Sequence, residues 1–520
     1  MALLHDLLVT LLLAVVILPA AALAARPAMR PDKPGLLATA CLIAALALGR
    51  GELWAVPGWM FLAPCAAAAF MLTFVVIARA FRQVDMMAIF LHADFGMKGA
   101  TLKGLENEII AAIASLSLVL LPTYLIRNLW DFGPWFYGLA AVVLVALNPL
   151  VQYVVRRQFL PTIAGDIAQH LVPPGPMQVP DTLPDLIVIY LEGTDRRFFD
   201  TAVFGNAAAP LAELEAEGLT FTNVAQIAGT GWSLAGMVAT QLGVPLLPRG
   251  LLTRNNLKIV DRFMPTLTAL GDVLGDQGYA MEYVVGGDQR FGGIEAFYRS
   301  HGNIRQIGLA EQSALYPADE VAAATIDWIL DDQMTFASAR LRHDALVAGT
   351  TPYLMVIETI GPHGRLGYLS RRASPTGRGI KSPDTKAVVR CTVEEAAWFV
   401  RDARVAHAAA GRGRPLLFAL LSDHLSHNRT AAPGAAEFKG RNTVIFLGQG
   451  AGQNSRQGAM IDVYPTLLHW MGFAQGPVAA GLGRSLLAEP PTLVETYGTR
   501  QIDAMLTSNA TLAARVWAAS

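Results

Sequence analysis

The first third of the chain is almost continuously apolar, and this constrains the fold more than any other feature. Five stretches have the composition of membrane-spanning helices, although the second is short: Leu3–Ala24, Gly35–Leu48, Trp54–Phe81, Ile109–Leu129 and Trp135–Val155. Aromatic residues lie near their ends, as expected at membrane interfaces: Trp54, Trp59, Trp130, Trp135 and Tyr137. We therefore predict an α-helical membrane domain over residues 1–157, with about five helices.

One segment of this region is less apolar than the rest. Residues 86–108 mix apolar side chains with His92, Asp94, Lys98 and Lys103. Such a mixture is typical of an interfacial helix, of a re-entrant segment or of a surface-lying connector.

The basic residues leave the orientation in the membrane open. Five spans with the rest of the chain outside would place Arg79, Arg82 and Arg156 outside as well, against the positive-inside rule. The charge rule alone therefore puts the rest of the chain in the cytoplasm, and one miscounted span would reverse this.

The remaining two thirds have the pattern of an α/β domain. A proline-rich linker over residues 158–183 leads to Asp185–Leu191, an apolar, β-rich run typical of a strand buried on both faces. Similar runs follow at Met281–Val285, Tyr353–Ile357, Pro415–Leu421 and Asn442–Leu447, with helical patterns between them at Pro265–Asp276 and Ala322–Leu341. We predict an α/β domain over residues 184–490 with a central, mostly parallel sheet, and a C-terminal tail over residues 491–520.

Charge and cysteine content exclude some classes of protein. The net charge is −1, so no overall field favours a nucleic-acid partner. Of the three cysteines, only Cys391 lies beyond the apolar region, so no disulfide framework can form within the α/β domain.

Polar residues with catalytic potential follow two of the predicted strands. Glu192 follows the first strand, and Asp423, His424 and His427 follow the fourth. Catalytic groups of α/β sheets gather at the carboxyl ends of strands, and a carboxylate beside an imidazole suits a divalent ion of the zinc or manganese type. Helix capping, turn formation or solvation would explain each of these residues singly.

A hydroxyl residue is placed to complete this group. Ser233 lies in GTGWSLAGM, Gly229–Met237, after a glycine turn and before a predicted helix, whose N-terminus favours an anionic phosphate. A simple N-cap serine is the alternative, and Thr230 is a second candidate nucleophile. The combination of strand-end Glu, helix-start Ser and strand-end Asp-His is more specific than any of its members.

These motifs resemble the phosphoglycerol transferases of periplasmic glucans, relatives of lipoteichoic acid synthases in the alkaline phosphatase and sulfatase superfamily. The resemblance covers residues 184 to about 487 and rests on GTGWSLAGMVATQLGVPLL, LLSDHLSHN and GLGRSLL. It implies one divalent metal ion, Mn²⁺ or Mg²⁺ rather than Zn²⁺, held by Glu192, Ser233, Asp423 and His424. Ser233 would be the nucleophile, in place of the family's usual threonine.

The resemblance also implies roles for residues outside the metal group. His363, in ETIGPHGRL, would protonate the leaving oxygen or bind glycerol phosphate. Asp288 and Arg290, in VVGGDQRFGG, resemble a headgroup-binding loop, although the spacing departs from that of the synthases. His427 completes the predicted substrate-binding residues.

The implied activity is transfer of a glycerophospho group from phosphatidylglycerol to a glucan or glycan hydroxyl, with release of diacylglycerol. It places the α/β domain in the periplasm, anchored to the bacterial inner membrane. Alternatives are a phosphoethanolamine transferase, a lipoteichoic acid synthase-like polymerase and a catalytically silent membrane scaffold. The lone Cys391 argues against the first, since those relatives usually carry several disulfides.

Overall fold

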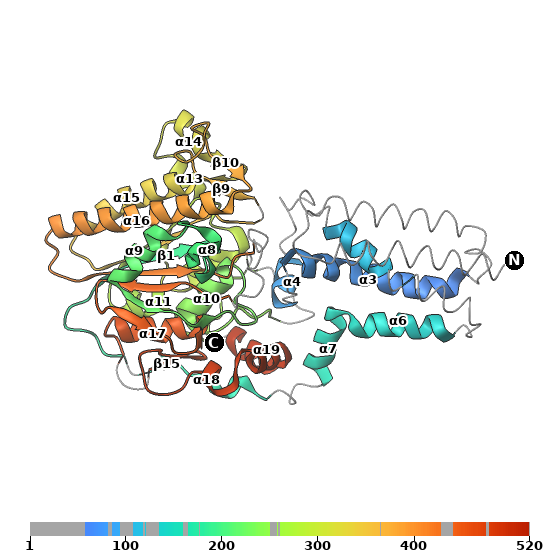
Figure 1. Ribbon diagram of the computed structural model, residues 1–520. Helices are drawn as coiled ribbons and strands as arrows, with labels where there is room; N and C mark the ends of the chain where they lie inside the picture. Colours follow the sequence, from blue (N-terminus) through green and yellow to red (C-terminus); the bar gives the residue numbers. More distant parts are fainter. Residues whose placement is uncertain are drawn as a thin grey trace. The chain divides into compact units, whose positions relative to one another are not determined.

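The computed structural model describes residues 58–81, 86–93, 108–117, 120, 135–159, 165–175, 177–249, 257, 260–364, 366–427, 440–474 and 478–518 (Figure 1). The chain divides into two compact units, Met1–Met86 with Lys98–Phe159 and Met87–Met97 with Leu160–Ser520. The first two predicted spans, Leu3–Ala24 and Gly35–Leu48, lie outside the described residues, as do Asp94, Lys98 and Lys103.

The first unit is helical where it is described. Its helices are α3 (Gly58–Phe81), residues 108–117, α6 (Trp135–Leu147) and α7 (Pro149–Phe159). Among the described helices, none alone has the length and hydropathy of a membrane span, but α6 and α7 together pass by these criteria. The predicted single span Trp135–Val155 is wrong in one respect, because the chain bends by 67° between α6 and α7. Asn148 caps the new helix by accepting from Leu150 N at 2.9 Å, and Pro149 begins it.

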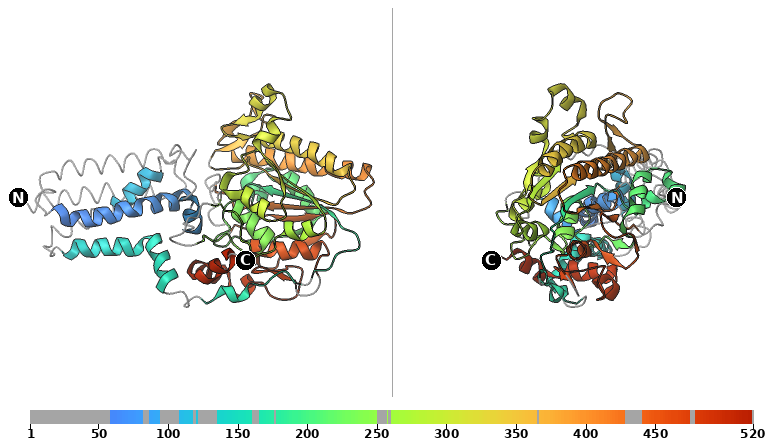
Figure 2. Two further views of the ribbon diagram at one scale, coloured as in Figure 1. Left: turned by 180° about the vertical axis from the view of Figure 1, so that it is seen from behind. Right: turned by 90° about the vertical axis from the view of Figure 1, so that its left-hand side faces the viewer.

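A twisted eight-stranded sheet forms the centre of the second unit (Figure 2). Its strand order is β13-β2-β12-β11-β1-β8-β4-β5, and every strand is parallel to its neighbours except β12, which is antiparallel to both of its own. The strands are β1 (Asp185–Leu191), β2 (Leu219–Phe221), β4 (Ala280–Val285), β5 (Arg305–Ile307), β8 (Tyr353–Glu358), β11 (Leu416–Ser422), β12 (Val444–Leu447) and β13 (Gly452–Asn454). The mostly parallel sheet predicted from the apolar runs is confirmed.

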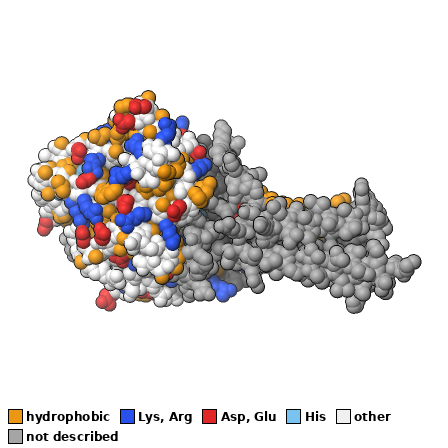
Figure 3. Space-filling view, turned by 45° about the horizontal axis from the view of Figure 1, so that its top comes forward, with side chains coloured by type: hydrophobic (Ala, Val, Ile, Leu, Met, Phe, Trp, Pro, Cys, Tyr) orange, Lys and Arg blue, Asp and Glu red, His pale blue; other side chains and the backbone are white. Residues whose placement is uncertain are grey.

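Helices cover both faces of the sheet, because successive side chains of a strand point to opposite sides. Leu186, Val188 and Tyr190 of β1 enter one apolar core, and Ile187 and Ile189 enter the other. The first core is closed by α10 (Ser233–Leu242), α11 (Leu270–Asp276), α12 (Ile294–Ser300) and α17 (Val463–Trp470), and the second by α9 (Ala209–Glu217), α15 (Asp332–Val347) and α16 (Thr385–Ala409). On the face seen in Figure 3, basic and acidic side chains are interspersed.

The predicted helix Ala322–Leu341 is wrong. The chain forms α14 (Ala318–Ala324), then a hairpin of β6 (Thr325–Ile326) and β7 (Ile329–Leu330), and then α15. Asp327 adopts a left-handed φ of 56° at the hairpin tip, which ends any helix. Asp331 starts the next helix by accepting from Met334 N at 2.9 Å. The other predicted helix, Pro265–Asp276, is shorter than expected and begins at Leu270.

Two segments outside the sheet complete the first core. The C-terminal residues form α18 (Leu493–Tyr497), α19 (Thr499–Ser508) and α20 (Ala510–Trp517), and they bury Ile502 and Leu512 there. From Met87 onward α4 (Met86–Ala93) also belongs to the second unit, where Met87 and Leu91 are buried.

The shorter elements are η1 (Ile167–His170), η2 (Arg196–Phe199), α8 (Thr201–Phe204), β3 (Val224–Ala225), η4 (Phe291–Gly293), α13 (Leu309–Ser313), β9 (Gly367–Leu369), β10 (Ile380–Ser382), β14 (Gly458–Ala459), η5 (Met460–Asp462), β15 (Ala479–Ala480) and β16 (Gly483–Arg484).

Candidate functional site

Two strand ends bring three metal-ligating side chains together. β1 and β11 are parallel neighbours in which Leu191 lies opposite Ser422, so the residues that follow them meet at one edge of the sheet. His424 Nε2 lies 3.3 Å from Glu192 Oε1 and 3.2 Å from Asp423 Oδ2. All three side chains are buried, and one ligand atom of each lies within 4.8 Å of the others.

Ser233 faces this cluster from the start of α10. Its Oγ donates a hydrogen bond to Glu192 Oε2 at 3.3 Å. Ser233 is the first residue of the helix rather than its N-cap, which is Trp232 and makes no side-chain cap hydrogen bond. The simple N-cap interpretation of this serine is therefore wrong.

Thr230, the second candidate nucleophile, is engaged elsewhere. It is fully buried, and its hydroxyl donates to Ile227 O at 2.8 Å while accepting from Ile227 N at 3.1 Å. Its oxygen closes its own turn, so the geometry favours Ser233 over Thr230.

The donor set fits a divalent cation. His424 donates from Nδ1 to Leu425 O at 2.9 Å, which leaves Nε2 directed at the two carboxylates. Metal-binding histidines typically fix their ring in this way. Asp423 uses Oδ1 to accept from Gly193 N and His424 N, both at 2.8 Å, while its buried Oδ2 has no hydrogen-bond partner among the described residues. A cation would satisfy this oxygen.

The charges of the cluster depend on one another. Burial and the charge of Glu192 raise the pKa of Asp423 to about 6. Burial by itself would lower the pKa of His424. The neighbouring Asp423 and Glu192 carboxylates outweigh this effect and raise the pKa to about 10. Burial alone would also raise the pKa of Glu192, yet His363 and His424 hold it well below its usual range. Two buried carboxylates thus require positive charge beside them, which a proton on histidine or a cation supplies.

A buried ion pair ties the two ligand loops together. Asp195 accepts from Ser426 N at 2.8 Å and pairs with the Arg197 guanidinium, which also donates to Ser426 O at 3.1 Å. These bonds join the loop after β1 to the loop after β11. Asp195 and Arg197 were not among the predicted site residues, although charged residues within a few positions of the end of a buried strand were the available signal.

His363 approaches Glu192 from the loop after β8. Its Nδ1 lies 3.2 Å from Glu192 Oε1. Burial would lower the pKa of His363, but Glu192 reverses this and raises it. Asp332 holds the loop by accepting from Ile360 N at 2.8 Å and Gly361 N at 3.0 Å. Asp332 was not among the predicted site residues, because it lies inside the helix predicted over residues 322–341.

The predicted substrate-binding residues fall into two places. The ring centroids of His427 and His424 lie 4.4 Å apart, so His427 borders the cluster. Asp288 and Arg290 form an exposed ion pair of 2.7 Å in the loop after β4. The same loop contacts the nucleophile segment, because a Cβ on Gly292 would lie 3.1 Å from the Trp232 ring.

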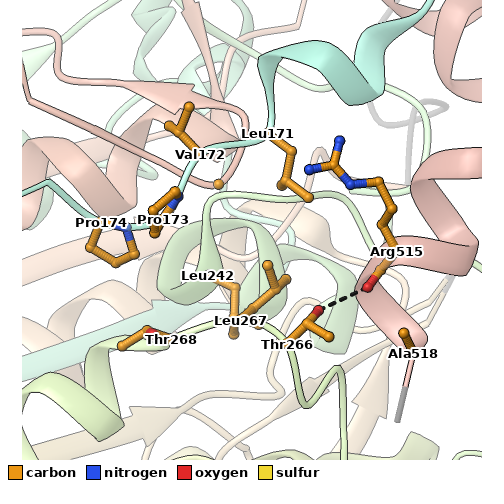
Figure 4. A pocket seen from close by; sticks show the side chains of 11 residues that line it. Leu171, Val172, Pro173, Pro174, Leu242, Thr266, Leu267, Thr268, Arg515 and Ala518 are labelled. Atoms are coloured by element: carbon orange, nitrogen blue, oxygen red, sulfur yellow. Dashed lines mark hydrogen bonds between the residues drawn. The ribbon is translucent and has the colours of Figure 1, made fainter. Parts of the chain in front are cut away.

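A cavity of about 370 Å³ lies at the other end of α10 (Figure 4). Its lining is mainly apolar, including Leu171, Pro173 and Leu242, and Thr266 there donates to Arg515 O at 2.9 Å. Leu242 is the last residue of α10 and Ser233 the first, so about 13 Å of helix separates this cavity from the cluster.

Comparison with known proteins identifies the relatives of this chain. No family model matches. A Xanthomonas campestris pv. campestris protein named phosphoglycerol transferase I is 28% identical over 436 residues, which cover 78% of this chain and 58% of that protein. The chain is thus similar in sequence to phosphoglycerol transferase I. A phosphoglycerol transferase I from Salmonella paratyphi B is 29% identical over 316 residues, 60% of this chain and 40% of that protein. The chain thus spans less than two thirds of these phosphoglycerol transferases, and the predicted resemblance is confirmed.

Two solved structures match parts of this chain. A protein of the alkaline phosphatase superfamily from Vibrio parahaemolyticus matches 66% of this chain and 79% of its own, with 17% identity and a TM-score of 0.47. The lipoteichoic acid synthase LtaP from Listeria monocytogenes matches 66% of this chain and 81% of its own, with 14% identity and a TM-score of 0.43.

Proposed function

We propose that the chain is a membrane-bound phosphoglycerol transferase. It moves a glycerophospho group from phosphatidylglycerol to a hydroxyl of a periplasmic glucan or glycan and releases diacylglycerol. The observation that carries this proposal is Ser233 Oγ at the start of α10, 3.3 Å from Glu192 and beside the Asp423–His424 pair. The relationship to phosphoglycerol transferase I supports the choice of the transferred group.

Glu192, Asp423, His424 and the Ser233 hydroxyl would hold one divalent metal ion, for which Mn²⁺ or Mg²⁺ is proposed. The mixed carboxylate and imidazole donors fit such an ion, as does the buried Asp423 Oδ2, which accepts no hydrogen bond from any described residue. When bound, the ion would screen the phosphate charge and lower the pKa of the serine hydroxyl.

In the first step, Ser233 Oγ attacks the phosphorus of the donor lipid. The Ser233 hydroxyl releases its proton to solvent, a bond forms between Oγ and phosphorus, and the bond between phosphorus and the diacylglycerol oxygen breaks. The N–H groups in the first turn of α10 bind the phosphate oxygens, because no side chain caps this helix. His363, whose pKa is raised beside Glu192, holds a proton that it gives to the leaving oxygen.

In the second step, a hydroxyl of the acceptor attacks the same phosphorus from solution. Its proton passes to the now neutral His363, the bond between Oγ and phosphorus breaks, and the Ser233 oxygen takes up a proton from solvent. The enzyme then returns to its starting state, with the glycerophospho group on the acceptor.

We place this reaction at the outer face of the bacterial inner membrane. The apolar first third of the chain would anchor it there, and tethering would keep the site near lipid headgroups. The bent pair α6–α7 supports an anchor by length and composition. A periplasmic α/β domain is preferred over the cytoplasmic side that the charge rule favours, because donor and glucan acceptor meet there.

The test is diacylglycerol release from labelled phosphatidylglycerol by the purified full chain with Mn²⁺. Wild type should release diacylglycerol and carry label on residue 233, located by peptide mass spectrometry, and Ser233→Ala should lose both. Thr230→Ser, which keeps the buried hydroxyl, is the matched control and should stay active. Label on residue 230, or undiminished release by Ser233→Ala, would overturn the assignment of the nucleophile.

The same assay decides between the donors. Release from phosphatidylethanolamine in place of phosphatidylglycerol would show a phosphoethanolamine transferase. Chains of glycerol phosphate without an added glycan would show a polymerase. No release from any lipid by folded, metal-loaded protein would support the silent scaffold.

A further inference from the structure

Two exposed aromatic rings stand beside the nucleophile segment, and the proposed function leaves them without a role. Phe291 and Trp328 stack on each other, with ring centroids 5.5 Å apart and an interplanar angle of 27°. Phe291 is 45% exposed and Trp328 38% exposed. Stacked aromatic rings normally stabilise a core, so a stacked pair this open to solvent has apolar faces available to a ligand.

The backbone beneath the rings holds them in place. Trp328 lies at the tip of the β6–β7 hairpin, next to the left-handed Asp327. A Cβ on Gly287 would lie 3.3 Å from the Trp328 ring, so the absence of a side chain there lets the tryptophan lie against the loop after β4. Phe291 comes from the same loop, in η4.

Contacts connect this pair to the cluster on both sides. On one side, Gly292 follows Phe291 and packs on the ring of Trp232, the residue before Ser233. On the other, Asp327 forms an ion pair with Lys381, whose Nζ lies 6.0 Å from the centre of the Tyr368 ring.

The second connection ends at the cluster itself. The Tyr368 ring stacks on His363, with centroids 6.3 Å apart and an interplanar angle of 10°. His363 in turn lies 3.2 Å from Glu192. The rings of Phe291 and Trp328 therefore belong to a continuous series of contacts that begins at Ser233 and returns to its hydrogen-bond partner.

Charged pairs border the aromatic rings. Asp288 and Arg290 pair on the loop that carries Phe291, and Asp327 and Lys381 pair beside Trp328. All four side chains are more than 40% exposed, so their oxygen and nitrogen atoms can reach a ligand without losing the ion pair. An acyl chain gains nothing from such neighbours. A sugar ring presents apolar C–H groups on its faces and hydroxyl groups around its rim, which matches apolar rings bordered by charged donors and acceptors.

We propose that Phe291 and Trp328 form a sugar-binding subsite for the acceptor glycan. A pyranose face stacks on the aromatic pair, and carboxylate oxygens of Asp288 and Asp327 accept hydrogen bonds from its hydroxyls. Another hydroxyl of the same glycan then points toward Ser233. The assignment of this sugar as the acceptor rests on the proposed transferase function, whereas sugar binding itself does not.

Binding can be measured without turnover. Cellohexaose and maltohexaose are titrated into the full chain in detergent, in Ser233→Ala background, and followed by isothermal calorimetry. Trp328→Ala and Phe291→Ala should each weaken binding by about fivefold or more, as expected for loss of one aromatic contact. Trp328→Phe should retain most of the affinity. This variant tests whether an aromatic ring at the tip of the hairpin is sufficient for binding.

Leu341→Ala is the matched control, because Leu341 is an exposed apolar side chain on α15 that lies outside this series of contacts. It should bind as the parent does. Equal affinity in Trp328→Ala and the parent, or no binding of either oligosaccharide by the parent, would overturn the subsite.

Turnover separates this proposal from the function on which it rests. In the serine-containing protein, Trp328→Ala should raise the KM for the oligosaccharide acceptor by about fivefold and leave diacylglycerol release without acceptor within about twofold of wild type. A parallel loss of both activities would assign Trp328 to donor binding and refute the acceptor subsite. Sugar binding by a protein that releases no diacylglycerol would refute the transferase and leave the subsite standing.

Discussion

Gly236 lets α10 approach the metal-ligand loop, and Gly236→Ala should therefore inactivate the protein. A Cβ at this position would lie 1.8 Å from Asp423 O and 2.7 Å from Asp423 C. An ordinary contact needs at least about 3.4 Å, so helix and loop must separate by about 1.6 Å. Both obstacles are backbone atoms, which no side-chain rotation can move.

The expected effect on stability combines two opposing contributions. Alanine is favoured over glycine inside a helix by about 1 kcal/mol. Overpacking a buried contact costs about 1–3 kcal/mol. Because the Cβ meets main chain here, the cost should exceed the gain, and the unfolding free energy should fall by up to about 2 kcal/mol.

The expected effect on activity is larger. Ser233 lies one helical turn before Gly236, so a shift of about 1.6 Å would carry its Oγ away from Glu192. A misplacement of about 1 Å costs on the order of 100-fold in rate. Diacylglycerol release should fall by about 100-fold in protein whose circular dichroism is unchanged.

Gly275→Ala is the control, since Gly275 also lies in a helix but a Cβ there would be close only to the flexible end of Met281, at 3.3 Å, with Gly302 Cα at an ordinary contact distance of 3.8 Å. It should keep its activity and be as stable as wild type or slightly more stable. Full activity of Gly236→Ala together with an unchanged or raised Tm would refute the close packing of α10 on the Asp423 loop.

Three further predictions concern positioning, pH and metal. Asp332→Asn should lower the transfer rate and shift its pH–rate profile, because one of the two backbone N–H groups that fix the His363 loop loses its acceptor. The unsatisfied N–H group should cost about 1–3 kcal/mol of stability. A pH–rate profile like that of wild type would contradict this. Burial raises the pKa of Glu358 to about 8, so its carboxyl keeps a proton in the fold that the unfolded chain releases. Stability should therefore fall as pH rises from about 4.5 through about 8, by up to about 1.4 kcal/mol per pH unit, and urea unfolding of Glu358→Gln should show a smaller loss. Chelation should lower the Tm, and Mn²⁺ at about 100 times its Kd should restore about 2.7 kcal/mol in wild type but not in Asp423→Ala; equal Tm values with and without Mn²⁺ would refute the metal site.

The central strands could be predicted because their burial leaves a direct trace in the sequence. β1 and β8 are apolar on both faces, so each appears as a short continuous run of β-prone residues. The edge strands could not, because β5 (Arg305–Ile307) and β13 (Gly452–Asn454) are short and partly exposed. Their pairing is decided by neighbours distant in the chain.

The same distinction applies to the candidate site. Glu192 and Asp423 were predicted because each directly follows an apolar strand, and parallel strands end at one edge. Asp332 and Trp328 were missed because the sequence between 322 and 341 has a helical pattern on either side of the hairpin. Two signals were present, the β-branched residues Thr325 and Ile326 and the Asp331 that starts α15, but a hairpin of two-residue strands depends on what packs around it.

The N-terminus of α10 lacks a stabilising side-chain cap at the position where the proposed chemistry takes place. Trp232 is the N-cap and supplies no side-chain acceptor, whereas serine or aspartate there would add about 1 kcal/mol. The adjacent Ser233 could not cap from its own position and donates instead to Glu192. A capping side chain would occupy the N–H groups that the proposed mechanism assigns to phosphate. A poorly capped helix is thus the arrangement expected when an anionic substrate completes the first turn, and it accounts for a tryptophan where capping residues normally stand.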